Sequence, residues 1–303
     1  MFPPKASRYL AFGLHWQSDF PLDQFPNDPS DNEVPDIFVL ASGEPLPRRQ
    51  EVSRWHNSQI CEDGFRFQAP DGVCFDYYHP DRLNVFTGQA GFGASSPYFY
   101  GTVVAAIASC RNAIPVHGTT MASGGAAVLL CGPRGAGKSS TAAALSASGF
   151  RLISDDLSVF RLSTMGQLVV SAGRTDIRLV PAAAQLLRKA LDLPPSGELS
   201  AYGKVLMRPP SLAPTEQVLL RSVISLQTGQ PEQDQDPGQK LKFLSSNVFR
   251  PRLMQRLPGA QMRAELLLKM LGGTQLRPLM TPQRFNDQTA EELAKRIAKF
   301  HLS

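Results

Sequence analysis

The sequence has few cysteines and no long hydrophobic segment, and each absence excludes a class of protein. Its 303 residues include four widely spaced cysteines that form no C-x-x-C pair, namely Cys61, Cys74, Cys110 and Cys131. We therefore expect neither a zinc site nor a disulfide framework, and we predict ordinary thiols that are buried or half-buried. The best candidate for a membrane helix, residues 126–131, is far shorter than the roughly 20 residues that a span needs.

We also expect no secretory signal, because the polar stretch at residues 15–19 follows soon after the start. We therefore expect a cytoplasmic protein with no membrane partner. Hydrophobic residues make up 42% and charged residues 19% of the chain, which is the composition of a folded protein rather than a disordered one. The 24 glycines and 25 prolines are scattered, so the chain is neither collagen-like nor of low complexity.

The net charge of +5 is distributed unevenly along the chain. Residues 1–100 carry 7 basic and 13 acidic side chains, a balance of −6, whereas residues 204–303 carry 15 basic and 8 acidic side chains, a balance of +7. The basic end can meet nucleotide phosphates, an acidic peptide or another subunit, or it can simply face solvent. No run of basic residues interleaved with aromatic ones accompanies the charge, so nucleic acid is not an expected partner.

The hydrophobic pattern changes after residue 105 and predicts two regions. Residues 1–105 are predicted to form a small β-rich N-terminal domain, because short apolar stretches alternate with clusters of turn-forming residues. Residues 106–303 follow the order strand, glycine-rich loop, helix and strand, which is typical of an α/β domain. Strands are expected at residues 37–40, 73–78, 83–86, 126–131, 152–154, 157–161 and 218–226. Helices are expected at residues 98–111, 139–148, 181–193, 261–271 and 287–300, with a polar loop over 228–240.

The strongest motif is the loop G-P-R-G-A-G-K-S, which matches the phosphate-binding pattern G-x-x-x-x-G-K-[ST] in full. Its glycines let backbone N–H groups turn inward around a phosphate, and the following helix contributes the positive end of its dipole. Lys138 is predicted to reach the β- and γ-phosphates, and the Ser139 hydroxyl to ligate Mg²⁺. We therefore expect ATP and Mg²⁺ as cofactors. The predicted nucleotide-binding residues are Gly132, Pro133, Arg134, Gly135, Ala136, Gly137, Lys138, Ser139 and Ser140.

Two adjacent aspartates, Asp155 and Asp156, follow Lys138 by 17 and 18 residues. The helix between the phosphate-binding loop and these aspartates carries the chain back across the sheet, so the next strand can end beside the loop. Phosphoryl transfer needs a carboxylate near Mg²⁺, and transfer to a hydroxyl is helped by a carboxylate that accepts its proton. We predict that Asp155 helps to bind Mg²⁺ and that Asp156 accepts the proton of the acceptor hydroxyl. Adjacent side chains in a regular strand face opposite sides, so this division requires the backbone to turn there.

Three segments together resemble the catalytic domain of HPr kinase/phosphorylase. They are His117-Gly118, the phosphate-binding loop, and G-F-R-L-I-S-D-D at residues 149–156. The family has an H-G segment, a strand, the loop, a helix and then G-H-x-L-x-A-D-D. The resemblance implies the P-loop fold of the family's C-terminal domain. It also implies that His117, 21 residues before Lys138, lies in the active site and orients or shares a proton with the aspartate pair.

The chain departs from the family at two places. Phe150 stands where the family has the histidine of G-H-x-L, and G-R-T-D-I-R-L-V-P at residues 173–181 replaces a glycine-rich signature of the type L-E-I-R-G-x-G. The phosphorylase activity, and HPr itself as substrate, are therefore not implied. The whole chain more closely resembles a diverged branch of stand-alone HPr kinase-like proteins, which includes kinases of lasso-peptide and related RiPP biosynthesis clusters. The similar segments lie at residues 9–14, 18–21, 176–181 and 247–251.

This resemblance implies an ATP- and Mg²⁺-dependent kinase whose acceptor is the serine of a peptide or small protein. Arg178 could neutralise charge on the transferring phosphoryl group, and Lys204 could do the same from a loop, although Arg178 is as well suited to the surface and Lys204 is better suited to it. A small-molecule kinase and a non-catalytic nucleotide-binding module remain as alternatives. Members of the family form hexamers, so the resemblance also allows a homo-oligomer.

Overall fold

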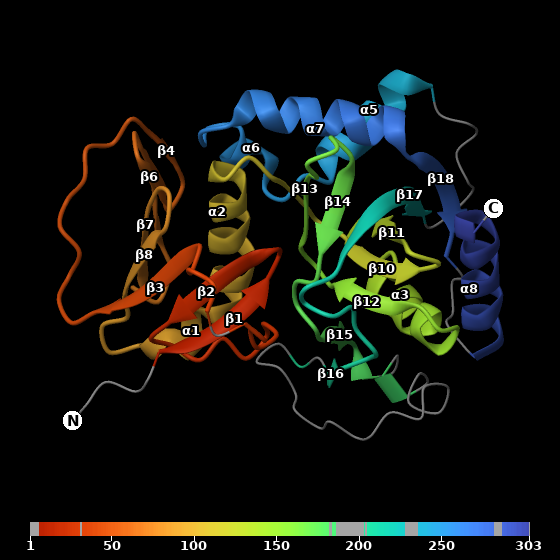
Figure 1. Ribbon diagram of the computed structural model, residues 1–303, viewed down its shortest axis with the longest axis horizontal. Helices are drawn as coiled ribbons and strands as arrows, with labels where there is room; N and C mark the ends of the chain where they lie inside the picture. Colours follow the sequence, from red (N-terminus) through yellow and green to blue (C-terminus); the bar gives the residue numbers. More distant parts are fainter. Residues whose placement is uncertain are drawn as a thin grey trace.

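Two large mixed sheets form the framework of the chain, and helices lie between, above and beside them (Figure 1). The computed structural model describes residues 6–30, 32–181, 184–185, 203, 205–227, 236–281 and 287–302. Over these residues the structure has the mixed α/β class that the sequence predicts. No helix within these ranges is long and apolar enough to cross a membrane.

The first sheet has eight strands in the order β1-β2-β3-β8-β7-β6-β5-β4. β3 is parallel to both of its neighbours, and the other pairs are antiparallel. Leu14, Trp16 and Ser18 are buried on β2, and this alternation is typical of a strand with one face on the core. β3, β7 and β8 confirm the three strands predicted at residues 37–40, 73–78 and 83–86, and the other five were not predicted individually. The strands of this sheet are β1 (Ser7–Ala11), β2 (Leu14–Ser18), β3 (Ile37–Ser42), β4 (Ser53–Trp55), β5 (Ser58–Cys61), β6 (Gly64–Gln68), β7 (Cys74–Tyr78) and β8 (Arg82–Phe86).

A helical segment lies between the two sheets in Figure 1. It consists of α1 (Gly91–Tyr98), the π-helical turn η1 (Phe99–Val103) and α2 (Val104–Cys110). Every residue of η1 and α2 is buried, in one apolar core that includes side chains of both sheets. The segment starts earlier than the expected helix, at Gly91. The domain division after residue 105 falls inside α2 and stays a prediction.

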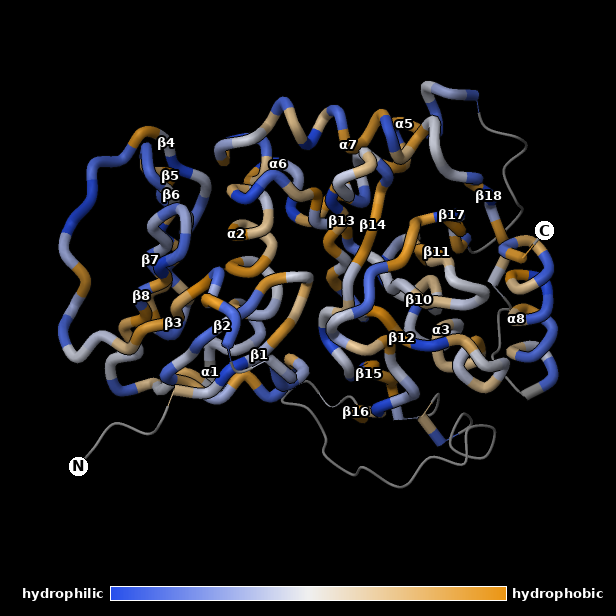
Figure 2. Tube along the Cα trace, viewed as in Figure 1, coloured by the Kyte–Doolittle hydropathy of each residue, from blue (hydrophilic) through white to orange (hydrophobic). Residues whose placement is uncertain are grey.

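The second sheet has the strand order β12-β10-β11-β17-β14-β13-β9, with β18 also beside β17. All six residues of β11 are buried, and β11 runs parallel to β17. Figure 2 shows hydrophobic residues concentrated on β13, β14 and the neighbouring α2. The strands are β9 (Ile114–Val116), β10 (Thr119–Ser123), β11 (Ala126–Cys131), β12 (Arg151–Ser154), β13 (Ser158–Leu162), β14 (Leu168–Ser171), β17 (Gln217–Gln227) and β18 (Gln275–Met280). A small separate sheet pairs β15 (Ile177–Leu179) with β16 (Val205–Met207).

Among the remaining helices, α3, α7 and α8 pack against the second sheet, whereas α6 lies above α2 (Figure 1). α3 (Lys138–Ala147) and α8 (Asp287–Leu302) pack together, and they contribute Leu145 and Ile297, among other buried residues, to one apolar cluster. The other helices are α5 (Pro237–Ser246), α6 (Pro251–Met254) and α7 (Ala260–Gly273). α3, α7 and α8 confirm three predicted helices. The helix expected at 181–193 and the polar loop expected at 228–240 lie largely outside the described residues. All four cysteines are buried, as predicted.

The end of the expected polar loop is helical instead, because α5 begins at Pro237. Asp236 caps this helix by accepting a hydrogen bond from the backbone N of Gln239 at 2.9 Å. The side chain of Gln239 in turn accepts from the backbone N of Asp236 at 3.1 Å. This reciprocal capping box, together with a proline in the first turn, outweighs the polar composition of the segment.

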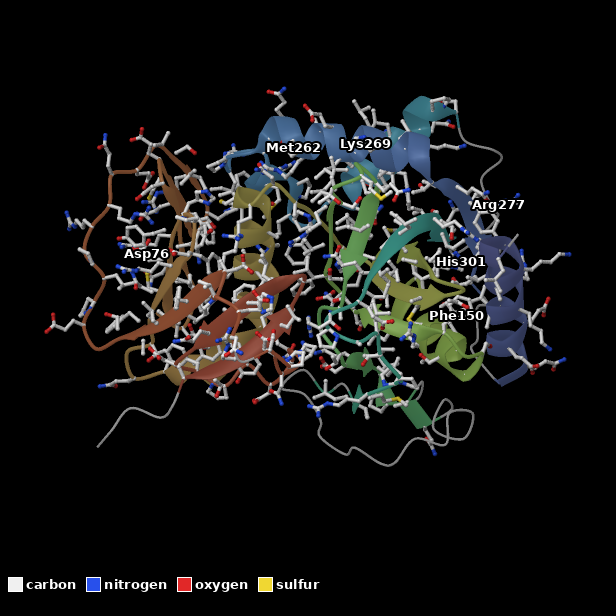
Figure 3. The ribbon with its side chains drawn as sticks, viewed as in Figure 1. Asp76, Phe150, Met262, Lys269, Arg277 and His301 are labelled. Carbon is white, nitrogen blue, oxygen red and sulfur yellow. The ribbon has the colours of Figure 1, made fainter. Side chains whose placement is uncertain are left out.

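His301, in the last turn of α8, is buried and ties this helix to the second sheet (Figure 3). Its Nδ1 lies 2.6 Å from the hydroxyl oxygen of Ser222, and its Nε2 lies 3.3 Å from the carbonyl oxygen of Ser123. Burial lowers the pKa of His301 below its ordinary value of 6.5, because desolvation disfavours the charged ring. The folded chain therefore favours the neutral histidine.

We expect the contribution of His301 to the free energy of unfolding to be complete above its ordinary pKa of 6.5 and to fall below it. Below this pH the unfolded chain binds a proton on His301, whereas burial disfavours the protonated ring in the folded chain. His301→Asn cannot titrate in this range, so the stability gap between wild type and variant should narrow between about pH 7.5 and about pH 5.5. Urea unfolding at both pH values measures the gap, and a gap that widens in acid contradicts the prediction.

Candidate functional site

The glycine-rich loop lies between the end of β11 and the start of α3, as its sequence predicts. Gly132 and Gly137 have φ angles of 149° and 83°, in the region that side chains disfavour. A Cβ at Gly132 would also lie 2.5 Å from the carbonyl oxygen of Leu226 on β17. The Nζ of Lys138 donates to the carbonyl oxygens of Gly132 at 2.8 Å and Pro133 at 3.2 Å. The backbone of the loop thus binds the ammonium group of its own lysine.

A cleft of about 420 Å³ opens beside this loop, which is within the usual size of a small-molecule site. It brings together the loop, the histidine, one aspartate and the arginine that the sequence singles out. Its lining residues are His117, Arg134, Gly135, Gly137, Lys138, Ser139, Ser140, Asp156, Arg178, Leu179 and Val180. Four predicted site residues do not line the cleft. They are Gly132, Pro133, Ala136 and Asp155, of which all but Pro133 are buried.

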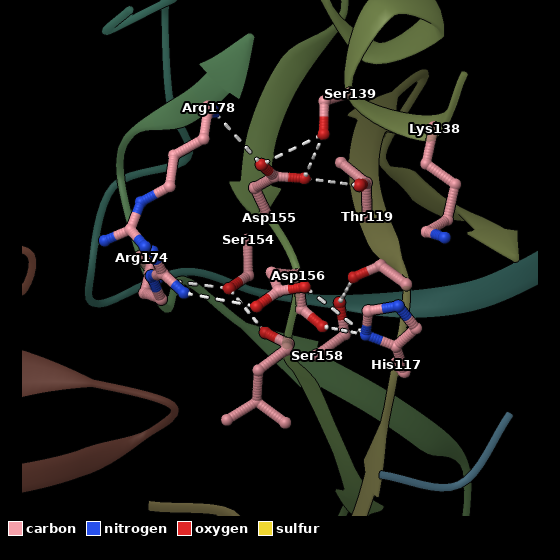
Figure 4. A network of polar contacts seen from close by, with 12 residues as sticks. His117, Thr119, Lys138, Ser139, Ser154, Asp155, Asp156, Ser158, Arg174 and Arg178 are labelled. Atoms are coloured by element: carbon pink, nitrogen blue, oxygen red, sulfur yellow. Dashed lines mark hydrogen bonds and ion pairs between the residues drawn. The ribbon is translucent and has the colours of Figure 1, made fainter. Parts of the chain in front are cut away.

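Asp155 follows β12, and its carboxylate faces Ser139 and Thr119 (Figure 4). Its carboxylate accepts a hydrogen bond from the Thr119 hydroxyl at 2.5 Å and one from the backbone N of Arg178 at 3.3 Å. The Ser139 hydroxyl lies 3.3 Å from both of its oxygens. Burial raises the pKa of Asp155, and the hydrogen bond from Thr119 opposes that shift only in part.

The oxygen atoms of Ser139 and Asp155 fit a magnesium ion. Mg²⁺ prefers hard oxygen ligands, and it usually takes one or two from the protein while phosphates and water supply the rest. Within the described ranges, no three His, Cys, Asp or Glu side chains gather into a larger metal cage. A divalent cation here would also offset the charge of a carboxylate that has been removed from water.

Asp156 turns away from its neighbour, because its backbone adopts the left-handed conformation with φ of 69°. Its carboxylate lines the cleft and is half exposed. One oxygen lies 3.3 Å from the Nδ1 of His117, and the other lies 3.6 Å from a guanidinium nitrogen of Arg174. The same Nδ1 lies 3.1 Å from the carbonyl oxygen of Asp156. The backbone turn that the predicted division of roles requires is therefore present.

His117 is positioned by residues 247–249, a segment far from it in the sequence. Its backbone N donates to the carbonyl oxygen of Asn247 at 2.7 Å, and the backbone N of Phe249 donates to the carbonyl oxygen of Pro115 at 2.9 Å. The ring of Phe249 contacts the imidazole with 6.1 Å between ring centres. These contacts fix the direction in which the imidazole faces Asp156.

Two arginines lie beside the aspartates, and only one of them is foreseen from the sequence. Arg178, on β15, lines the cleft, and its Nε lies 3.7 Å from Asp176. Burial lowers the pKa of Arg178, and the nearby charge of Arg174 acts in the same direction. Arg174 and Thr119 belong to no motif in a single sequence, so their contacts with the aspartates could not be predicted. Lys204 lies outside the described residues.

Phe150, at the position of the second family histidine, lies in the core rather than at the cleft (Figure 3). Its ring contacts that of His301, with 6.0 Å between ring centres. A hydrophobic side chain suits this site, because the surrounding residues from α3, α8 and the second sheet form an apolar cluster.

No protein-family model and no curated protein matches this chain. Among solved structures, the chain is similar to the HPr(Ser) kinase/phosphatase from Coxiella burnetii, at 20% sequence identity and a TM-score of 0.26. The likeness covers 41% of this chain and 71% of that chain. It is therefore a partial likeness, and the interpretation of the site rests on its own geometry.

We expect Thr119→Val to destabilise the fold by about 1.5–3 kcal/mol, because it removes a hydrogen bond to a buried carboxylate. Thr120→Val is the matched control. Thr120 is equally buried, but its hydroxyl donates to the neutral Ser158 hydroxyl at 2.6 Å, so its loss should cost only about 0.5–1.5 kcal/mol. Urea unfolding of the two variants measures the difference. Equal losses in the free energy of unfolding would contradict the prediction that the hydrogen bond of Thr119 to Asp155 contributes more than that of Thr120 to Ser158.

Proposed function

We propose that the chain is a kinase that transfers the γ-phosphoryl group of ATP to a hydroxyl, most specifically to serine of a peptide or small protein. The observation that carries this proposal is the separation of two adjacent carboxylates. Asp155 faces the loop hydroxyl of Ser139, whereas Asp156 faces the cleft beside His117. A nucleotide-binding module needs only the first of these. A carboxylate open to the cleft is what proton transfer from an acceptor hydroxyl requires.

The loop and Asp155 account for nucleotide binding in this mechanism. Lys138 exchanges the carbonyl oxygens of Gly132 and Pro133 for oxygens of the β- and γ-phosphates. Ser139 and Asp155 would hold Mg²⁺, which would supply positive charge to offset that of the phosphates. Arg178, on the wall of the cleft, adds a second cation near the transferring group.

Asp156 accounts for transfer to the acceptor. Its carboxylate takes the proton of the acceptor hydroxyl while the acceptor oxygen bonds to the γ-phosphorus and the bond from that phosphorus to the β–γ bridging oxygen breaks. ADP then leaves with the bridging oxygen. His117 keeps the carboxylate turned toward the cleft through its Nδ1, 3.3 Å from one carboxylate oxygen. The choice of a peptide serine comes from the resemblance in the sequence, and the site geometry supports hydroxyl transfer in general.

We expect Asp156→Asn to lower phosphoryl transfer by about 10²–10⁴-fold, the usual contribution of a general base, while ATP binds with nearly unchanged affinity. Lys138→Ala should lose both binding and transfer, because it removes the contact to the phosphates. The assay combines the protein, Mg²⁺ and γ-labelled ATP with a size-fractionated cell extract. Label in a peptide or protein band that requires both residues supports the proposed acceptor.

Lys269→Ala is the control for the loss of a lysine, because Lys269 lies on α7 away from the phosphate loop (Figure 3). It should retain full transfer. Label confined to the small-molecule fraction would contradict the peptide acceptor and favour a metabolite kinase. A wild-type protein that binds ATP but labels no fraction would contradict the kinase and favour a binding module.

A further inference from the structure

The first sheet contacts the candidate site through the turn between β1 and β2, formed by Phe12 and Gly13. The backbone N of Phe12 donates to the carbonyl oxygen of Ala172 at 2.6 Å. Arg161, on β13, holds the turn from the other side by donating to the carbonyl oxygens of Phe12 at 2.6 Å and Gly13 at 3.2 Å. The turn therefore lies directly against the residues that follow β14.

These following residues, 172–174, fit tightly between the turn and the end of β12. A Cβ at Gly173 would overlap the ring of Phe12 and would lie 2.6 Å from the hydroxyl oxygen of Ser154. The backbone N of Gly173 donates to the carbonyl oxygen of Ile153 at 2.8 Å, and that of Arg174 donates to the Ser154 hydroxyl at 3.1 Å. Ser154 immediately precedes the aspartate pair, so the position of Arg174 is fixed relative to Asp156.

The side chain of Arg174 lies beside Asp156 (Figure 4), and Arg174 is not among the residues that line the cleft. It is 3% exposed, its guanidinium lies 6.0 Å from the ring centre of Tyr100, and its ion pair in the described structure is with Asp156 at 3.6 Å. A buried guanidinium without a counter-charge is costly, so this pair favours one orientation of the carboxylate. His117 approaches one oxygen of Asp156 and Arg174 the other.

We propose that Arg174 is a positioning residue that fixes the Asp156 carboxylate toward the cleft, and that the β1–β2 turn holds Arg174 in place through Phe12. The kinetic consequence rests on the proposed kinase function. The N-terminal sheet is then a working part of the site rather than a separate module. A carboxylate displaced by about 1 Å can lose about 10²-fold in rate, which sets the scale of the expected effect.

The kinetic test replaces Arg174 and Phe12 and separates kcat from KM. Arg174→Gln should lower kcat at least tenfold and leave the KM for ATP within about twofold, because Arg174 lies outside the cleft. Arg174→Lys keeps the charge and should restore part of kcat. Phe12→Leu should lower kcat severalfold, whereas Phe67→Leu, an equally buried phenylalanine of the same sheet, should not. An unchanged kcat in Arg174→Gln, or equal kcat losses in the two leucine variants, overturns the proposal.

Two further measurements test the inference without an assay of phosphoryl transfer. Hydrogen exchange at the Gly173 and Arg174 amides should accelerate in Phe12→Leu and stay unchanged in Phe67→Leu, because only Phe12 contacts Gly173. Unfolding midpoints of Asp156→Asn, Arg174→Gln and the double variant should be non-additive. Unchanged exchange or additive midpoints overturn the inference even in an active kinase. If both effects appear in a protein that labels no acceptor, the proposed function fails while the structural role of Arg174 stands.

Discussion

The left-handed backbone at Asp156 is the constraint on which the candidate site depends. It lets two neighbouring carboxylates meet different partners: Asp155 contacts Thr119 and Ser139 in the interior, and Asp156 faces His117 at the cleft. This conformation costs most residues about 1–2 kcal/mol, although aspartate adopts it more readily than most. The cost is offset locally, because the backbone N of Leu157 donates to the carbonyl oxygen of Asp155 at 2.9 Å, within the turn itself.

Segments far apart in the sequence hold this turn in place. Residues 12–13 support Arg174, residues 247–249 support His117, and the start of β10 supplies Thr119. Residues 12–13 and 247–249 act through backbone hydrogen bonds and aromatic rings, and Thr119 contacts Asp155 through its short, buried hydroxyl side chain. Sites fixed this way keep their geometry, because the supporting groups have little rotamer freedom of their own. The apolar core that joins both sheets makes these separate supports parts of one body.

Local sequence patterns predicted the parts of the site that are contiguous in the chain, and they missed the parts that depend on topology. The phosphate loop needs a strand, glycines and a helix in a row, so residues 126–147 were readable from the sequence. The contact of Thr119 with Asp155 arises only because β10 pairs with β12, and that of Arg174 only because the first sheet packs against residues 172–174. α5 was missed for a different reason, since its capping box was overlooked within a polar segment. The roles assigned to the site residues stay predictions.

Lys138 and Asp156 carry different weight in distinguishing a kinase from a binding module. In this structure Lys138 donates to the carbonyl oxygens of Gly132 and Pro133, so the lysine stabilises the loop in addition to its proposed contact with phosphates. Removing Lys138 therefore changes both the loop and its contact with a nucleotide. A loss of nucleotide binding would follow in a kinase and in a binding module alike. Asp156 forms its ion pairs with His117 and Arg174 rather than with the loop. Its carboxylate lines the cleft without contacting the loop lysine, so a change at Asp156 tests the proposed group transfer separately from nucleotide binding.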